Sequence, residues 1–296
     1  MSVLAARAAW KGLSPAERDF VEHPRLDGSA SPDEWLARLA GVVRYDGFVN
    51  RVLARLMGWG IGGIGLGVAL FIVGGFLSGP APHLTVPVGL LAIAAALFGV
   101  ASFVYRYMWS KVDVPDVLAE TVLPLLSLMA MELPDGDPVQ LTLDLRGSEL
   151  DEKKHDYTET GSWSSLPHHK NTFYLDPWLQ LDATLVDGSR MRVSIRDVLR
   201  VRKTTKRSQS GKRKMKTKHK VKRRIRARLS VRPDRGLEAV GGAHIRVRHG
   251  GKRQHITAEA RYVADEALFS TPPDALVQVM TRCFVHTARR PEPPCP

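Results

Sequence analysis

Basic and apolar residues alternate along residues 215–231, which read MKTKHKVKRRIRARLSV. Successive side chains of a β-strand point to opposite faces. One face would therefore carry only cations, namely Lys216, Lys218, Lys220, Lys222, Arg224, Arg226 and Arg228. The other face would carry Met215, Val221, Ile225, Ala227, Leu229 and Val231, although His219 weakens this pattern and Arg223 breaks it. The spacing predicts a strand that buries one face from about Val221 onward and presents a row of cations on the other.

The positive charge of the chain is concentrated around this strand. Residues 198–233 contain seventeen Lys or Arg and no Asp or Glu, so the net charge of +13 leaves −4 for the remainder. Cations two positions apart on one strand face lie about 7 Å apart and repel each other by about 0.6 kcal/mol per pair in water. A polyanion would relieve this repulsion, whereas the alternative is a solvated edge whose lysines prevent aggregation. We predict polyanion binding by Lys212, Arg213, Lys214, Lys216, Lys218, Lys220, Lys222, Arg224, Arg226 and Arg228, with Arg192, Arg196, Arg200 and Arg202 from the preceding strand.

The composition of this stretch also bears on the kind of polyanion. Residues 198–233 contain no Phe, Tyr or Trp, and sheets that read single-stranded nucleic acid stack bases on aromatic side chains. Each Lys or Arg near an anionic membrane surface contributes about 1 kcal/mol to binding. The sequence therefore favours anionic lipid headgroups. An acidic protein surface and nucleic acid remain as alternatives.

Two glycine patterns lie in the apolar segment that follows residue 56. GIGGIG, residues 60–65, matches a dinucleotide-binding motif but lacks the strand before it and the acidic residue after it, so we predict no cofactor there. Two small-xxx-small spacings let another helix backbone approach closely, and they are formed by Gly58 with Gly62 and by Gly63 with Gly67. The predicted partner is the second apolar helix, through Ala94, Ala95 or Gly99. One alternative is a second copy of the chain, and another is that these glycines have no packing role, because glycine is common in membrane helices.

A polar segment, residues 148–176, gathers histidines and carboxylates without a recognised ligand spacing. It contains His155, His168 and His169 with Asp151, Glu152, Asp156 and Glu159. We predict an exposed loop rather than a metal site. Because no catalytic motif is found elsewhere, we expect no metal, no cofactor and no enzymatic activity. An enzyme would require a cleft in which one of these histidines meets a carboxylate.

The elements that position the basic strip begin with a membrane hairpin. Residues 56–105 contain no Asp, Glu, Lys or Arg, and about 20 apolar residues suffice to cross a bilayer. We predict two spans, residues 53–77 and 84–109, joined by the turn SGPAPH. Trp59, Tyr105, Tyr107 and Trp109 lie near their ends, as interfacial aromatic residues do. The alternative is a buried helical hairpin of a soluble protein.

Charged residues flanking the spans predict the orientation. Arg38, Arg44, Arg51 and Arg55 precede the first span, and Arg106 and Lys111 follow the second, whereas the turn has no Lys or Arg. The positive-inside rule places both termini in the cytoplasm. The apolar run at the N-terminus is too short for a cleavable signal. We expect a multi-pass protein of the cytoplasmic (inner) membrane.

The fold class expected is an α+β membrane protein. Residues 1–50 read as cytoplasmic helices with capping boxes at SPAE and SPDE, and residues 51–110 as the transmembrane hairpin. Residues 112–290 read as a cytoplasmic β-rich domain that begins with a helix over about 115–133, kinked at Pro124.

The rest of this domain is expected to be an antiparallel, barrel-like meander of six or seven strands. Its hairpins turn at Asp187-Gly188, within a basic hairpin spanning 198–233, and at Gly250-Gly251, and a helix over about 273–289 closes it. Residues 291–296 read as a disordered tail. The strand count and final helix look like a pleckstrin-homology-type barrel, an architectural analogy that no motif residue supports.

Two functional hypotheses follow from these features. In the first, the protein is a membrane scaffold or adaptor whose basic β domain docks on anionic lipid or on an acidic partner. In the second, it is a membrane-anchored sensor or effector that binds nucleic acid or a nucleotide and oligomerises through the glycine-rich span.

Overall fold

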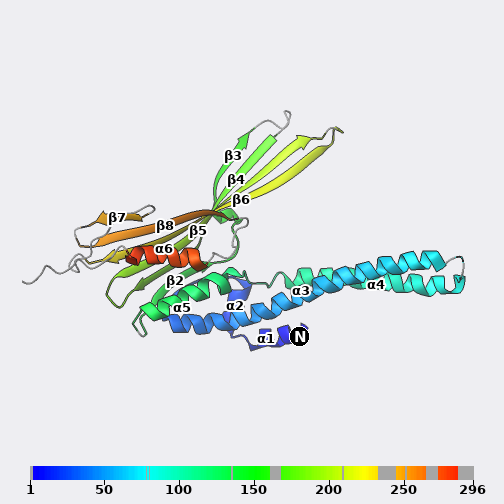
Figure 1. Ribbon diagram of the computed structural model, residues 1–296, viewed down its shortest axis with the longest axis horizontal. Helices are drawn as coiled ribbons and strands as arrows, with labels where there is room; N and C mark the ends of the chain where they lie inside the picture. The colour runs from blue at the N-terminus through cyan, green and yellow to red at the C-terminus, as the bar shows by residue number, and fades with distance from the viewer. Residues whose placement is uncertain are drawn as a thin grey trace, which may run out of the picture. The chain divides into compact units, whose positions relative to one another are not determined.

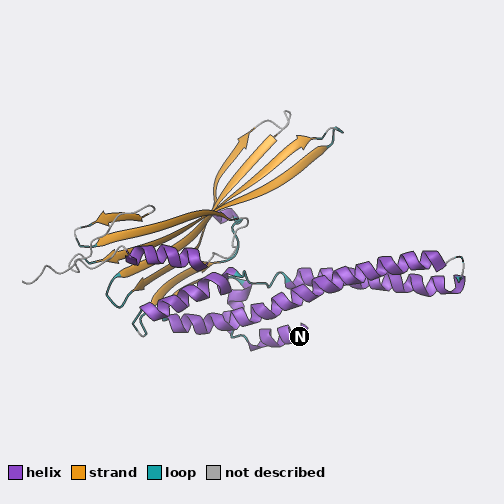
Figure 2. Cartoon of the chain, in the orientation of Figure 1, coloured by secondary structure: helices purple, strands orange, loops and turns teal. Residues whose placement is uncertain are grey.

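The computed structural model describes residues 3–77, 79, 81–134, 136–160, 168–208, 210–232, 245–250, 252–264 and 273–285. The chain divides into two compact units, one formed by residues 1–22 and 40–114 and the other by residues 23–39 and 115–296. The first is helical and the second contains all the described strands (Figures 1 and 2). Each is described separately below.

Four helices make up most of the first unit: α1 (Val3–Gly12), α2 (Pro15–Glu22), α3 (Pro32–Leu77, whose first turns belong to the second unit) and α4 (Pro82–Trp109). The capping box predicted before α2 is confirmed. The Glu17 amide donates to Ser14 Oγ at 3.3 Å, and the Ser14 amide donates to Glu17 Oε2 at 2.7 Å. Before α3, the Glu34 amide donates to Ser31 Oγ at 3.2 Å.

Helices α3 and α4 are each long and apolar enough to span a membrane. The predicted break between them is confirmed, because α3 ends at Leu77 and α4 begins at Pro82. Only 17% of the most apolar stretch of α3 and 11% of that of α4 is buried. The core helices of a soluble unit are mostly buried, whereas most residues of these two apolar stretches are exposed.

The two glycine pairs of α3 have different surroundings. A Cβ atom at Gly63 would lie 2.9 Å from the Gly99 nitrogen and 3.0 Å from the Ala95 carbonyl oxygen of α4, and Gly67 is similarly close to Ala92 and Ala96. The structure therefore places Gly63 and Gly67 against α4, where only glycine allows this approach. A Cβ atom at Gly58 or Gly62 would meet nothing within 4 Å, so these two glycines do not contribute to packing within the hairpin.

The eight strands that the structure describes form a single antiparallel sheet in the second unit. The order is β1-β2-β4-β5-β6-β8-β7, and β3 pairs with β4 outside this path. The strands are β1 (Arg25–Ala30), β2 (Val139–Asp144), β3 (Lys154–Thr160), β4 (His168–Thr184), β5 (Arg190–Arg207), β6 (Arg213–Val231), β7 (Ile245–His249) and β8 (Gln254–Ala264).

The sheet corrects three expectations from the sequence. Residues 25–30, expected to be helical, form β1 and pair with β2, because an edge strand can be recruited from a distant segment of the chain. The segment 148–176, expected to be a loop, contains a 3-10 turn (Asp151–Lys153), β3 and the first half of β4. The described strands are more numerous than expected, and they form an open path rather than a barrel, because β1 and β7 at the two ends of the order are not paired with each other among the described residues. The three predicted hairpin turns are confirmed.

The inner face of the sheet carries the core of this unit. Leu141, Leu181, Val193, Ile225 and Ala258 lie on neighbouring strands and are fully buried. The helix α5 (Leu123–Glu132) and the C-terminal helix α6 (Pro273–Val285) supply further buried apolar side chains. The thiol of Cys283 in α6 contacts the Ala227 carbonyl of β6 at 3.5 Å, which confirms the predicted closing helix. Part of that prediction, residues 286–289, and the tail lie outside the described residues.

The helix predicted over 115–133 is interrupted, but not by a kink at Pro124. A π-helical turn, Leu118–Val122, precedes α5, and Pro124 lies in the first turn of α5. Proline is tolerated there because the first amides of a helix have no intrahelical acceptor. The buried Trp35 at the start of α3 donates from Nε1 to the Val139 carbonyl at 3.1 Å, which ties residues 32–39 to the sheet.

Part of the sheet extends beyond these helices. Figure 1 shows β3 and the adjoining ends of β4, β5 and β6 projecting as a separate blade away from α5 and α6. We call this region the distal blade, and it comprises β3, residues 168–175 of β4, 199–207 of β5 and 213–220 of β6, with Val221 at its boundary. Its apolar content is small, because its buried cluster consists of Leu199, Val201 and Val221, with Tyr174 packed against them.

Candidate anion-binding surface

The alternation in β6 separates its side chains as the sequence predicts, but only along part of the strand. Val221, Ile225, Ala227, Leu229 and Val231 are buried on the inner face. From Arg213 to Lys220 every residue is exposed, so there the strand has two solvated faces. We refer to residues 221–231 as the proximal half of β6 and to 213–220 as the distal half.

Arg223, the residue that breaks the alternation, is paired with a carboxylate in the core. Its Nε and Nη2 donate to Oδ1 and Oδ2 of Asp197 at 2.8 and 2.7 Å, and both side chains are fully buried. The guanidinium carbon also lies 5.4 Å from the centre of the Trp178 ring. Because Arg223 is directly across from Asp197, and Asp197 from Asp176, a polar row crosses the inner face where the helix-covered sheet meets the distal blade.

The second carboxylate of this row has its own cation. Lys153 Nζ lies 2.7 Å from Asp176 Oδ1, and the Ser148 hydroxyl donates to Asp176 Oδ2 at 2.6 Å. Burial raises the pKa of Asp176, and these hydrogen bonds oppose that shift. A bulge between Asp176 and Leu179 interrupts the pairing of β4 with β5 at this point, and Pro177, which cannot donate to the ladder, lies in it.

The outward cations of the proximal half have a carboxylate partner that the sequence analysis missed. Glu259 of β8 accepts from Arg224 at 2.5 Å and from Arg226 at 3.3 Å, and it also pairs with Arg261. Burial would raise the pKa of Glu259, but these three arginines lower it to about 2. The carboxylate is therefore ionised at neutral pH and neutralises part of the row.

Neighbouring predicted cations on β5 are also affected by this arrangement. Arg192 forms an ion pair with Asp182 of β4. Arg196 lies directly across from Arg224, and burial together with Arg224 and Arg226 lowers its pKa. Burial is the larger cause of this shift, and the neighbouring arginines add to it by disfavouring a further positive charge.

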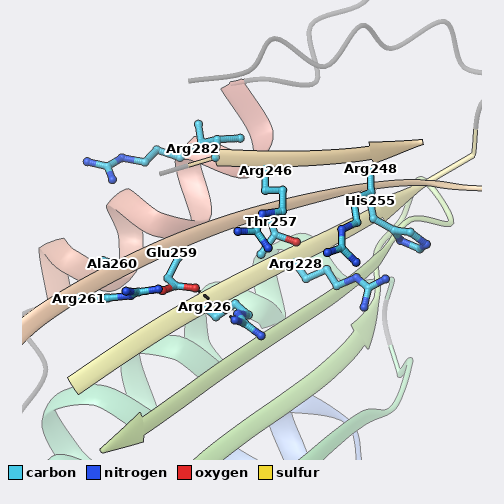
Figure 3. A pocket seen from close by; sticks show the side chains of 11 residues that line it. Arg226, Arg228, Arg246, Arg248, His255, Thr257, Glu259, Ala260, Arg261 and Arg282 are labelled. Carbon is cyan, nitrogen blue, oxygen red and sulfur yellow. Dashed lines mark hydrogen bonds and ion pairs between the residues drawn. The ribbon is translucent and has the colours of Figure 1, made fainter. Parts of the chain in front are cut away.

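Next to Glu259 the outer face is hollowed into a groove of about 750 Å³ (Figure 3). We call it the arginine groove, and its charged lining consists of Arg226, Arg228, Arg246, Arg248, His255, Glu259, Arg261 and Arg282. Figure 3 shows Arg226, Arg261 and Glu259 grouped at one end and Arg248 and His255 at the other. A second hollow, of about 520 Å³, shares Arg228 and His255 with the groove and continues toward Asp182 and Arg192.

The distal blade carries the remaining predicted cations, and they lie opposite one another. Arg200 is across from Lys220, Arg202 from Lys218, and Lys206 from Lys214, all on one face. Arg207 and Arg213 face each other on the opposite side, and Lys212 lies in the turn. Among the described residues, no Lys or Arg between positions 200 and 220 forms an ion pair. Like charges directly opposite each other destabilise a sheet.

The histidines of segment 148–176 contact nearby side chains instead of converging on one ion. His168 pairs with Glu159, and His169 Nδ1 lies 3.1 Å from Thr204 Oγ1 and 3.3 Å from Arg202 Nη2. Within the described part of the chain, no three His, Cys, Asp or Glu residues are grouped as metal ligands.

The predicted cation set is thus divided between two regions. Arg192, Arg196, Lys222, Arg224, Arg226 and Arg228 lie over the helix-covered sheet, and the other predicted cations lie on the distal blade. Sequence reasoning missed Arg246, Arg248, His255, Glu259 and Arg261. Their alternation in HIRVRH and in HITAEAR would have placed them on strand faces, but their proximity to β6 depends on the insertion of β8 between β6 and β7.

Comparison of the chain with models of known protein families, with curated protein sequences and with solved structures finds no match.

Proposed function

We propose that the protein is a multi-pass membrane scaffold or adaptor, anchored by α3 and α4, whose basic β domain binds anionic lipid headgroups through the distal blade. The membrane part of the proposal is supported by the exposure of the two apolar helices. Lipid would cover side chains such as Phe71, Phe76 and Leu97, whose exposed fractions are 75%, 76% and 64%.

The proposed topology places both termini in the cytoplasm, because the arginines precede α3's apolar stretch and follow that of α4. One of them, Arg106, donates from Nη1 to the Leu53 carbonyl at 2.6 Å and so joins the two helices at this end. The proposed location is the cytoplasmic (inner) membrane.

A single observation carries the lipid-binding proposal: the cations of the distal blade face one another across β5 and β6 without a carboxylate partner among the described residues. Over the helix-covered sheet, Arg224 and Arg226 pair with Glu259 and Arg192 pairs with Asp182, whereas the described lysines and arginines at positions 200–220 form no ion pair. A surface of headgroup phosphates would supply the missing negative charge, at about 1 kcal/mol for each cation near it.

The test uses the full chain in nanodiscs of neutral lipid, mixed with neutral or anionic vesicles. A fragment beginning at residue 112 would lack β1 and Trp35, which belong to the second unit. We expect flotation with vesicles containing phosphatidylserine and not with phosphatidylcholine vesicles, and loss of flotation in K216Q/K218Q. Equal flotation with both kinds of vesicle would rule the proposal out. If the wild type does not float with anionic vesicles but binds an acidic protein, the adaptor alternative is favoured.

A further inference from the structure

Three arginines on the strands of the arginine groove form no ion pair among the described residues. Arg228 of β6 lies directly across from Thr257 of β8, and Thr257 lies directly across from Arg246 of β7. In the next row, His255 lies across from Arg248. None of Arg228, Arg246 and Arg248 forms an ion pair within the described part of the chain.

The spacing of these residues produces a cradle. Neighbouring strands lie about 4.8 Å apart, so the backbones of Arg228 and Arg246 are about 10 Å apart. Only the short Thr257 side chain lies between these two residues. Figure 3 shows the side chains of Arg228, Thr257 and Arg246 near one another, with Arg248 and His255 beside them. The long side chains of Arg228 and Arg246 therefore border a gap, and the hydroxyl group of Thr257 lies at its base.

The surroundings favour an anion in this gap over water alone. Glu259, the acidic residue of the lining, is already shared by Arg224, Arg226 and Arg261. Burial and the charges of Arg228 and Arg253 lower the pKa of His255, so the imidazole is neutral at pH 7 and offers one donor and one acceptor. Its Nδ1 atom is buried and has no hydrogen-bond partner among the residues that the structure describes.

We propose that the arginine groove binds a compact cluster of two or more phosphate groups. A guanidinium group matches phosphate oxygens bidentately, and three such groups around one gap exceed what a single phosphate needs. The described lining contains no Phe, Tyr or Trp, so a nucleobase would find no aromatic platform to stack on. The site uses residues other than those of the distal blade, and its ligand is either a soluble polyphosphate or the headgroup of a lipid with two phosphates.

The test measures binding of inorganic tripolyphosphate to the full chain in neutral nanodiscs by calorimetry at constant ionic strength. We expect affinity at least roughly tenfold higher than for sulfate, and a loss of roughly tenfold or more in R246Q/R248Q. The matched control is K216Q/K218Q, which removes the same charge from the distal blade and should bind tripolyphosphate like the wild type. Both pairs are exposed, and circular dichroism verifies that the variants keep their sheet content.

Two outcomes would overturn the proposal: tripolyphosphate binding no tighter than sulfate, or equal losses in the groove and blade variants. Cardiolipin vesicles distinguish the source of the phosphates. If they displace tripolyphosphate from the wild type, a lipid headgroup is the ligand, and if they do not, the ligand is a soluble polyphosphate. Failure of phosphatidylserine flotation would affect only the function proposed for the distal blade.

Discussion

The two halves of β6 have the same alternating cations but different surroundings. In the proximal half, helices cover the inner face, and Glu259 neutralises part of the outer face. In the distal half, both faces are solvated and each outward cation faces another cation or a polar residue across β5. The same sequence pattern therefore gives Arg224 and Arg226 a carboxylate partner in one half, whereas no lysine or arginine of the other half has an ion-pair partner among the described residues. The register of the neighbouring strands, and not the pattern itself, decides which cations keep an unpaired charge.

The polar row between the two halves should give the largest effect. D197A removes the carboxylate that pairs with the buried Arg223 guanidinium, and breaking a buried ion pair in this way typically costs about 3–5 kcal/mol. We expect this loss in the free energy of unfolding of the full chain in neutral nanodiscs, measured from denaturant midpoints. D197L/R223M, which removes both charges, should cost much less.

The matched control for D197A is D182N, because Asp182 pairs with Arg192 on the solvated face. The Arg192 side chain is 56% exposed, and exposed pairs contribute about 0–1 kcal/mol. Equal effects of D197A and D182N would show that the polar row does not separate a core-supported region from the blade.

The division of β6 into two halves could largely be predicted from the sequence, but the residues that pair with its charged side chains could not. The parity of Val221, Ile225 and Leu229 marks where the inner face begins, because strand periodicity is local. The role of Arg223 could not be predicted in this way, because its partner Asp197 lies on another strand and is recognised only through register. Glu259 was missed for the same reason, because β8 pairs with β6 although β7 comes between them in the sequence.

The helical hairpin shows the same limit. The absence of charged residues over 56–105 and the break at SGPAPH predict two helices and their ends. Four glycines at equivalent spacings gave no indication of which pair contacts α4, because facing depends on the rotation of α3 about its axis. That rotation places Gly63 and Gly67 against α4 and leaves open space at Gly58 and Gly62.

Removing Glu259 should make the proximal half resemble the distal half. At pH 7, E259Q leaves Arg224, Arg226 and Arg261 without their carboxylate, and hydrogen bonds to charged groups contribute about 1.5–3 kcal/mol. We expect the free energy of unfolding to fall by about 1–3 kcal/mol and flotation with anionic vesicles to increase.

The effect of E259Q should depend on pH in a defined direction. The arginines lower the pKa of Glu259 from 4.5 to about 2, so its stabilising contribution is complete above pH 4.5 and is lost as the pH falls toward 2. The difference between wild type and E259Q should therefore shrink from pH 7 to pH 3 in denaturation experiments. E149Q is the control, because Glu149 is exposed and its Oε1 lies 3.6 Å from His219 Nε2. A pH-independent effect of E259Q would contradict the pairing.

The smallest effect on stability should come from giving the distal half a carboxylate. Lys218 lies directly across from Arg202, so K218E replaces a repulsive cross-strand pair with an attractive one. Opposite charges at such positions contribute about 0.2–1 kcal/mol, and we expect a gain of that size together with weaker flotation on anionic vesicles. K252E changes the net charge equally but lies in the turn between β7 and β8, and it should leave flotation near the wild-type value. If K218E is more stable and binds anionic vesicles less, the repulsion between cations in the distal blade costs stability and serves binding. If K218E and K252E reduce flotation equally, net charge governs binding, and not the register of β5 and β6.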